Sequence, residues 1–222
     1  NYAFLVYLLG LPALLLVAFN LPNERLKAVS SRPFSASLKR FAPSVIGMYL
    51  QMLLFFIFPT NFAITARANE ALTGNDITLI MVGLDVVAAI IGVIFGWMMK
   101  NMGRSVKYMA PLTFMVGYAL FAMGTATSLL LSGAFFVGLA NGIGMPYLNT
   151  IASIKGGKDA ATTVMPLISA AMYLGQFTSP LIVSPISEAV GGANSPYLVG
   201  VAISVLFLIQ AFLSKKYQAY EV

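Results

Sequence analysis

Long apolar stretches separated by short polar segments occupy almost the whole sequence. Seven can be marked, each roughly 18–26 residues long, which is the length an α-helix needs to cross about 30 Å of hydrocarbon. They cover Tyr2–Asn20, Pro43–Ala66, Ile77–Met99, Tyr108–Thr125, Ser128–Ser153, Ala161–Ile186 and Pro196–Leu213. The pattern therefore predicts an all-α fold, a polytopic membrane helix bundle.

Basic residues are distributed unevenly between the two ends of these spans. Of the 13 Lys and Arg residues, 12 fall on one side of the membrane when the spans alternate in direction. Those 12 are Arg25, Lys27, Arg32, Lys39, Arg40, Lys100, Arg104, Lys107, Lys155, Lys158, Lys215 and Lys216, and the other side holds Arg67. Short loops rich in Lys and Arg stay cytoplasmic. We expect a multi-pass protein of the cell (plasma) membrane, with the amino end of this sequence outside and its carboxyl end in the cytoplasm.

Composition removes several classes of function. Hydrophobic residues make up 59% of the chain and charged residues 9%, whereas soluble domains carry about 25% charged residues. The net charge of +6 lies in juxtamembrane loops, so no nucleic-acid partner is expected. Cys and His are both absent, which removes thiol nucleophiles, Cys-ligated metals and the commonest general base. We expect no enzyme activity, no metal and no cofactor.

The longest polar segment separates the first span from the other six. The segment Leu21–Ala42 carries five basic residues and one acid, and the later connections are short. The sequence also opens at Asn1 directly inside an apolar stretch, without the basic region that begins a signal peptide, so further upstream helices are expected. The predicted organisation is a last helix of a preceding lobe at 1–20, a basic cytoplasmic linker at 21–42 and a six-helix lobe at 43–222.

Five polar side chains fall within one or two helical turns of the expected bilayer centre: Gln51, Asp85, Asn141, Tyr173 and Gln176. An unpaired polar group in hydrocarbon costs several kcal/mol, so these side chains should face a cavity or the bundle interior. They belong to the second, third, fifth and sixth spans. The first span is almost uniformly apolar, and the polar positions of the fourth and seventh are mainly Thr, Ser, Gly and the near-terminal Gln210. The side chains Phe4, Leu120 and Phe207 of these three spans are expected to face lipid.

Asp85 is the only acid well inside a span, and no span offers Lys or Arg at a similar depth. It is either protonated, which suits proton coupling, or paired with a cation from another segment or from a substrate. A neutral Asp85 bonded to a neighbouring helix is the structural alternative. Gln51, Asn141, Tyr173 and Gln176 are candidates for substrate binding, and each could instead hold two helices together.

Prolines are placed alike in two spans that stand three apart. Pro59 lies in the second span and Pro146 in the fifth. Proline removes one backbone hydrogen bond and bends a helix. Matched prolines of this kind indicate an internal three-plus-three repeat, which is typical of alternating-access transporters.

Two motifs resemble those of the major facilitator superfamily. The first, Gly96-Trp97-Met98-Met99-Lys100-Asn101-Met102-Gly103-Arg104-Ser105-Val106-Lys107, is similar to the second-half copy of the family's loop motif G-x-x-x-D-R-x-G-R-R/K. Gly96, Gly103 and Arg104 match, whereas Lys100 and Asn101 stand where the family has Asp and the first basic residue. The second, GLANGIGMPYLNT at 138–150, is similar to the pattern G-x-x-x-G-x-x-x-P of the family's tenth helix.

The resemblance covers essentially the whole chain and implies a twelve-helix, two-lobed carrier. The chain would supply the sixth helix, the central loop and helices seven to twelve, and the missing amino-terminal lobe would be a partner. The expected function is alternating-access secondary transport, most simply proton-coupled export (antiport) of a small organic compound. A uniporter, or a proton symporter that imports a polar metabolite, is the alternative. A seven-helix receptor is a remote one, since the last span lacks a retinal-binding lysine and the chain lacks Cys.

Overall fold

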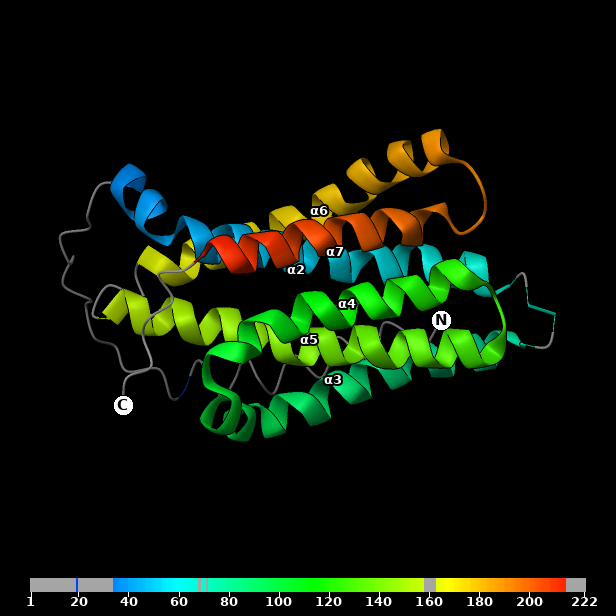
Figure 1. Ribbon diagram of the computed structural model, residues 1–222, viewed down its shortest axis with the longest axis horizontal. Coiled ribbons are helices and arrows are strands. Elements are labelled where there is room, and N and C mark those ends of the chain that lie inside the picture. Colours follow the sequence, from blue (N-terminus) through cyan, green and yellow to red (C-terminus); the bar gives the residue numbers. More distant parts are fainter. Residues whose placement is uncertain (1–18, 20–33, 68, 71, 158–162, 215–222) are drawn as a thin grey trace. The chain divides into compact units, whose positions relative to one another are not determined.

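A computed structural model of the chain describes residue 19 and residues 34–67, 69–70, 72–157 and 163–214 (Figure 1). The chain divides into two compact units, residues 1–30 and residues 31–222. The first unit, with the predicted span Tyr2–Asn20 and its Phe4, lies outside the described residues except for Phe19. The second unit contains the six other predicted spans.

The described part of the second unit is built from six α-helices and one short 3₁₀ helix, and none of its residues forms a strand. Every one of the six predicted spans overlaps one α-helix. In chain order the elements are α2 (Phe34–Ala66), α3 (Gly74–Met102), η2 (Gly103–Ser105), α4 (Val106–Met123), α5 (Thr127–Gly156), α6 (Met165–Val190) and α7 (Ser195–Leu213).

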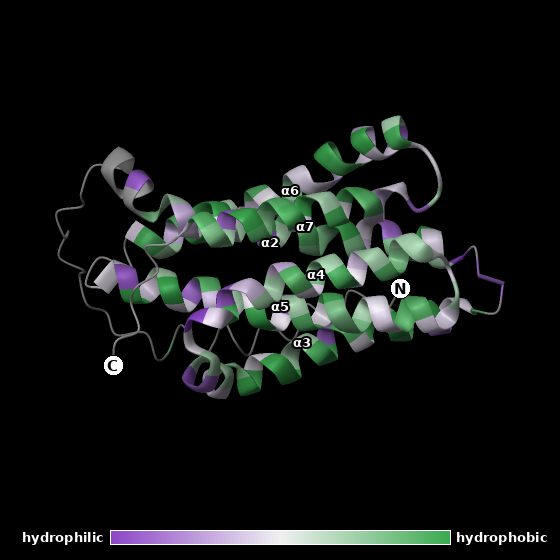
Figure 2. Ribbon diagram, in the orientation of Figure 1, coloured by the Kyte–Doolittle hydropathy of each residue, from purple (hydrophilic) through white to green (hydrophobic). Residues whose placement is uncertain are grey.

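Five continuous helical stretches are long and apolar enough to cross a membrane. The longest, Gly74–Met123, contains α3, η2 and α4. The chain reverses direction at η2, so α3 and α4 are separate helices that run in opposite directions along the bundle (Figure 1). Hydrophobic residues colour most of each helix, while hydrophilic residues gather toward the ends (Figure 2). The described residues thus form an all-α bundle whose helices are compatible with a multi-pass membrane protein.

Local sequence explains where α3 begins and ends. Thr73 and Asp76 form a capping box: the Asp76 amide donates to the Thr73 hydroxyl (3.3 Å), and the Thr73 amide donates to the Asp76 carboxylate (2.8 Å). At the other end Gly103 takes a φ of +49°, where a side chain would be strained. Helix α2 instead begins at Phe34, inside the segment predicted as a linker, and continues through Pro43 and Pro59.

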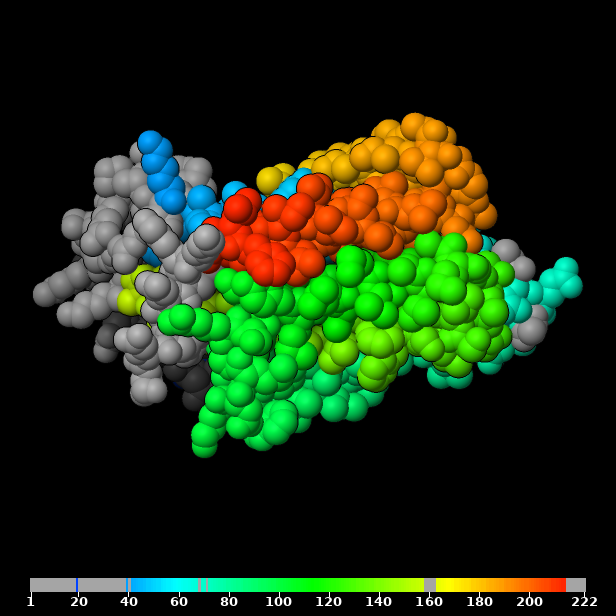
Figure 3. Space-filling model, in the orientation of Figure 1, coloured from blue at the N-terminus to red at the C-terminus, as the bar shows by residue number. Residues whose placement is uncertain are grey.

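The first three helices (α2, α3 and α4) pack mainly against the last three (α5, α6 and α7). Helix α2 packs against α6, α3 packs against α5, and α4 packs against both α5 and α7, so the most extensive helix contacts join one half to the other. Helices α4 and α7 lie side by side between them (Figure 3), and α3 and α6 do not contact each other within the described residues. Helix α3 is peripheral, since 17% of its span's apolar window is buried, against 56% for α2.

Glycines set the distance between the helices in two pairs, α3–α5 and α2–α6. A Cβ on Gly138 or Gly142 of α5 would lie 2.6 Å from a backbone oxygen of α3, that of Leu84 or Ala88. On α6, a Cβ on Gly175 would lie 2.5 Å from the Tyr49 carbonyl oxygen of α2. Larger residues would push the helices apart, because small residues are what permit close helix approach in a membrane.

The prediction that Phe207 faces lipid is wrong. Phe207 of α7 is only 3% exposed and lines a small space with Lys107, Tyr147 and Leu148, and Leu120 of α4 is half-buried. Uniformly apolar composition does not reveal which face of a membrane helix packs against protein, since lipid and protein core are both apolar. Helices α4 and α7 therefore carry inner faces that close the bundle.

Candidate functional site

Two of the predicted polar residues meet between α2 and α5. The Gln51 side chain of α2 is fully buried, and its Nε2 lies 3.4 Å from the Oδ1 of Asn141 and 3.5 Å from the carbonyl oxygen of Ala140. Its Oε1 has no hydrogen-bond partner among the described residues. Counting 1.5 Å per residue, Gln51 is about 15 Å from the start of the apolar part of α2, and thus close to its middle.

Gly144 creates the space that the Gln51 side chain occupies. A Cβ on Gly144 would lie 2.1 Å from Oε1 and 2.8 Å from Nε2 of Gln51. These distances are far below van der Waals contact, so a side chain at position 144 and the observed position of Gln51 exclude each other. The amide is therefore held in a slot of α5.

A second polar seam joins α2 to α6. The Ser179 hydroxyl donates to the Leu53 carbonyl oxygen (2.8 Å), and the Thr178 hydroxyl donates to the Tyr49 hydroxyl (3.0 Å). Gln176 is half-buried, and its Nε2 lies 3.8 Å from the Sδ of Met52, the residue after Gln51. Thr178 and Ser179 were not among the predicted residues, although they follow Gln176 within one helical turn.

Asp85 and Tyr173 lie apart from this seam. Asp85 is exposed on α3 and forms no hydrogen bond or ion pair with the described residues, and Tyr173 is 63% exposed on α6. Since α3 and α6 do not contact each other, the structure does not gather all five predicted side chains in one place. Sequence counting gives the depth of a residue along its helix, but not the direction in which its side chain points.

The exposed position of Asp85 has a physical consequence. The residue is about 16 Å from the start of α3, near the middle of the helix. A carboxylate at that depth is costly against acyl chains and is found facing protein or water-filled cavities. Lipid is therefore the least favourable neighbour for the Asp85 face of α3.

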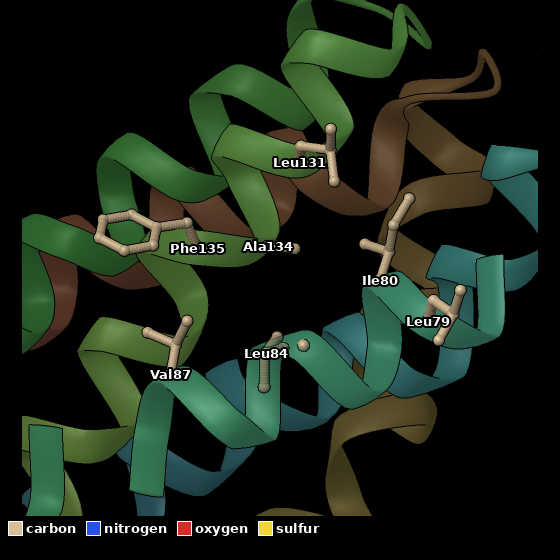
Figure 4. A pocket seen from close by; sticks show the side chains of 8 residues that line it. Leu79, Ile80, Leu84, Val87, Leu131, Ala134 and Phe135 are labelled. Atoms are coloured by element: carbon tan, nitrogen blue, oxygen red, sulfur yellow. The ribbon is translucent and has the colours of Figure 1, made fainter. Parts of the chain in front are cut away.

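Two apolar grooves lie between packed helices, one between α3 and α5 and one between α2 and α6. The groove between α3 and α5 holds about 270 Å³ and is lined by Leu79, Ile80, Gly83, Leu84, Val87, Leu131, Ala134 and Phe135 (Figure 4). The groove between α2 and α6 holds about 360 Å³ and is lined by Val45, Ile46, Tyr49, Leu167, Ala170, Ala171 and Leu174. The first groove is in the first half of α3 and near the start of α5, the second is in the first half of α2 and near the start of α6, and α2 and α3 start at opposite ends of the bundle (Figure 1).

The α3 wall of one groove and the α6 wall of the other use equivalent positions of the two halves. An offset of 87 positions relates Ile80, Gly83, Leu84 and Val87 of α3 to Leu167, Ala170, Ala171 and Leu174 of α6. The same offset relates Pro59 to Pro146. The predicted three-plus-three repeat therefore has a counterpart in the groove linings, in which one half of the repeat is inverted relative to the other.

The loop motif is located where α3 gives way to η2. Gly103 supplies the positive φ of the reversal, whereas Gly96 has open space around it and Arg104 is exposed. Asn101, which stands in place of the expected basic residue, donates from Nδ2 to the Trp97 carbonyl oxygen (2.9 Å) of its own helix. Of the three residues that match the motif, only Gly103 has a structural role among the described residues, which is to form the turn after α3.

The described residues contain no cluster of His, Cys, Asp or Glu with the composition of a metal site. Comparison with protein-family models and with curated protein sequences finds no match to this chain.

Proposed function

We propose that this chain forms the second lobe of a secondary transporter of the major facilitator superfamily, which moves a small organic compound across the plasma membrane by alternating access. The span Tyr2–Asn20 and the basic linker would connect it to a first lobe. The observation that carries the proposal is that the helices of two inverted halves pack across each other, with α2 against α6 and α3 against α5.

Inverted repeats suit alternating access for a geometric reason. The two halves can adopt each other's conformation, so a site at their interface opens first to one side and then to the other. In this chain the matched grooves lie toward opposite ends, and the Gln51–Asn141 contact lies between them, where the first helices of the two halves meet. Midplane position and location between repeats are what a transport site requires.

The chemistry of this region favours a polar organic substrate. The Gln51 and Asn141 amides can each donate and accept hydrogen bonds, and Gln176 with Tyr173 would extend the site along α6. Asp85 is the group that can carry a proton or pair with a cationic substrate, from a face of α3 that suits contact with the first lobe. Proton-coupled antiport uses both properties and is the form of the mechanism we favour.

Accessibility of Asn141 from the two sides of the membrane tests the proposal. In full-length protein freed of any other cysteine, Asn141→Cys should react with a small impermeant thiol reagent applied to intact cells. It should also react when the reagent is applied to inside-out vesicles, because a carrier opens its centre to each side in turn.

Val137→Cys is the matched control. Val137 is on α5 one turn before Asn141 and is fully buried, so its cysteine should react from neither side. Reaction of the Asn141→Cys protein from neither side, with the protein correctly inserted, would rule out a central pathway here. Reaction from one side only would favour a receptor over a carrier.

A further inference from the structure

A third apolar groove, between the beginning of α2 and the end of α7, has a feature that the other two lack. It holds about 410 Å³, and its walls include Ala42, Pro43 and Ile46 of α2 with Leu206, Ile209 and Leu213 of α7. The polar atoms at its base are engaged: Gln210 donates from Nε2 to the Pro43 carbonyl oxygen (2.7 Å), and the Ser214 hydroxyl donates to the Ala211 carbonyl oxygen (2.9 Å). The side chains that line the open part of the groove are therefore apolar.

Two described lysines lie near one end of this α2–α7 groove. Lys39 is exposed one turn before Ala42, and Lys107 lies against the last turn of α7, where it shares a small space with Gln210 and Ser214. In the sequence, Arg40 precedes the groove on α2, and Lys215 and Lys216 follow Ser214 directly.

The described carboxylates lie elsewhere. Glu70, Asp76 and Glu188 are near the opposite end of the helices, and Asp85 is halfway along α3. Positive charge at this end of the groove is therefore not neutralised by a described acid.

We propose that the α2–α7 groove binds an anionic phospholipid from the leaflet at the Lys-rich end of the bundle. An acyl chain would lie along Ile46, Leu206 and Ile209, and the phosphate would be held by Lys39 and Lys107. The groove is on membrane-spanning helices, so the molecules that reach it are lipids, and basic clusters at helix ends attract anionic headgroups. The site is separate from the polar seam proposed for transport.

Photocrosslinking can locate such a lipid. The full-length protein would be reconstituted in phosphatidylcholine vesicles that contain a small fraction of either phosphatidylglycerol or phosphatidylcholine with a diazirine in the acyl chain. After illumination, labelled peptides are mapped by mass spectrometry. At the α2–α7 groove, labelling by phosphatidylglycerol should exceed labelling by phosphatidylcholine roughly tenfold, as two basic contacts of modest strength would give.

The α3–α5 groove is an internal control in the same sample. It is equally apolar, but the described charges next to its α3 wall are the acids Asp76 and Asp85, so phosphatidylglycerol should show no excess over phosphatidylcholine there. The double variant Lys39→Gln, Lys107→Gln should abolish the excess at the α2–α7 groove, while the matched pair Lys100→Gln, Arg104→Gln at the α3–η2 turn should retain it. Unchanged labelling of the α3–α5 groove shows that each variant is folded and inserted.

Three results would overturn the proposal. One is equal labelling of the α2–α7 groove by the two lipids. A second is an excess of phosphatidylglycerol at both grooves alike. The third is an excess that survives the Lys39→Gln, Lys107→Gln change. Because none of these measurements involves transport, the lipid site can fail while the transporter proposal stands, and the reverse also holds.

Discussion

Gln51 of α2 occupies a slot in α5 that exists only because residue 144 is glycine. A Cβ at Gly144 would lie 2.1 Å from the Oε1 of Gln51. The amide reaches Asn141 through this slot, so the polar contact at the centre of the bundle depends on the absence of one methyl group.

Gly144→Ala should lower the stability of the bundle by about 1–3 kcal/mol, because Gln51 must leave its slot or the helices must separate. Thermal unfolding of the purified protein in detergent measures the loss. Gly92→Ala on α3 is the matched control, since no atom lies within 4 Å of a Cβ at that position. Equal midpoints for the two variants would show that the slot is unnecessary.

Gln51 and Asn141 should be energetically coupled. We expect Gln51→Leu and Asn141→Leu to be non-additive by about 0.6 kcal/mol, with about 1.7 kcal/mol as the upper end for such bonds in membrane proteins. A double-mutant cycle on unfolding free energies gives this value. Additive effects would mean that the 3.4 Å contact contributes nothing to stability.

Asp85→Asn should abolish uphill transport driven by a pH gradient while leaving substrate binding intact, because the amide imitates a protonated acid. Transport into proteoliposomes with and without the gradient, alongside equilibrium binding, measures both. Asp76→Asn removes a carboxylate from the capping box instead and should leave coupling unchanged. If Asp85 pairs with a cationic substrate, binding itself should weaken by about 1.5–3 kcal/mol. Normal coupling and affinity would leave Asp85 a structural role only.

Orientation can be read from cysteines introduced at exposed positions near the helix ends. Ser128→Cys and Ala193→Cys should react with an impermeant thiol reagent in intact cells. Ser105→Cys and Ser153→Cys, at the end rich in Lys and Arg, should react only after the cells are permeabilised. Reversed labelling of the two pairs would refute the predicted topology.

Tyr118→Phe should destabilise the lobe by about 0.5–1.5 kcal/mol, the usual net value of one hydrogen bond. Tyr118 is fully buried on α4 and donates from its hydroxyl to the Leu54 carbonyl oxygen of α2. Thermal unfolding again measures the change, and the exposed Tyr173→Phe should have an effect near zero. A similar loss for both variants would contradict the importance of the α4–α2 bond.

The sequence alone determined which segments are helices and roughly where they end. Spans of apolar residues long enough for a bilayer predicted all six described helices, because an apolar segment in lipid must satisfy its own backbone hydrogen bonds. Local residues fixed some helix ends: the capping box of Thr73 and Asp76 begins α3, and Gly103 with its positive φ ends it. Counting residues also placed Gln51 and Asn141 at the same depth, where the structure joins them.

The tertiary structure alone decided the direction of each side chain and the partner of each helix. Phe207 is buried and Asp85 is exposed, although the sequence predicted that Phe207 would face lipid and that Asp85 would face a cavity or the bundle interior. In a soluble protein the polar face of a helix identifies its outer side. In a membrane the outer side is as apolar as the core, so that signal is lost. Helix pairing depends instead on close approach at Gly138, Gly142 and Gly175, which only the packed structure reveals.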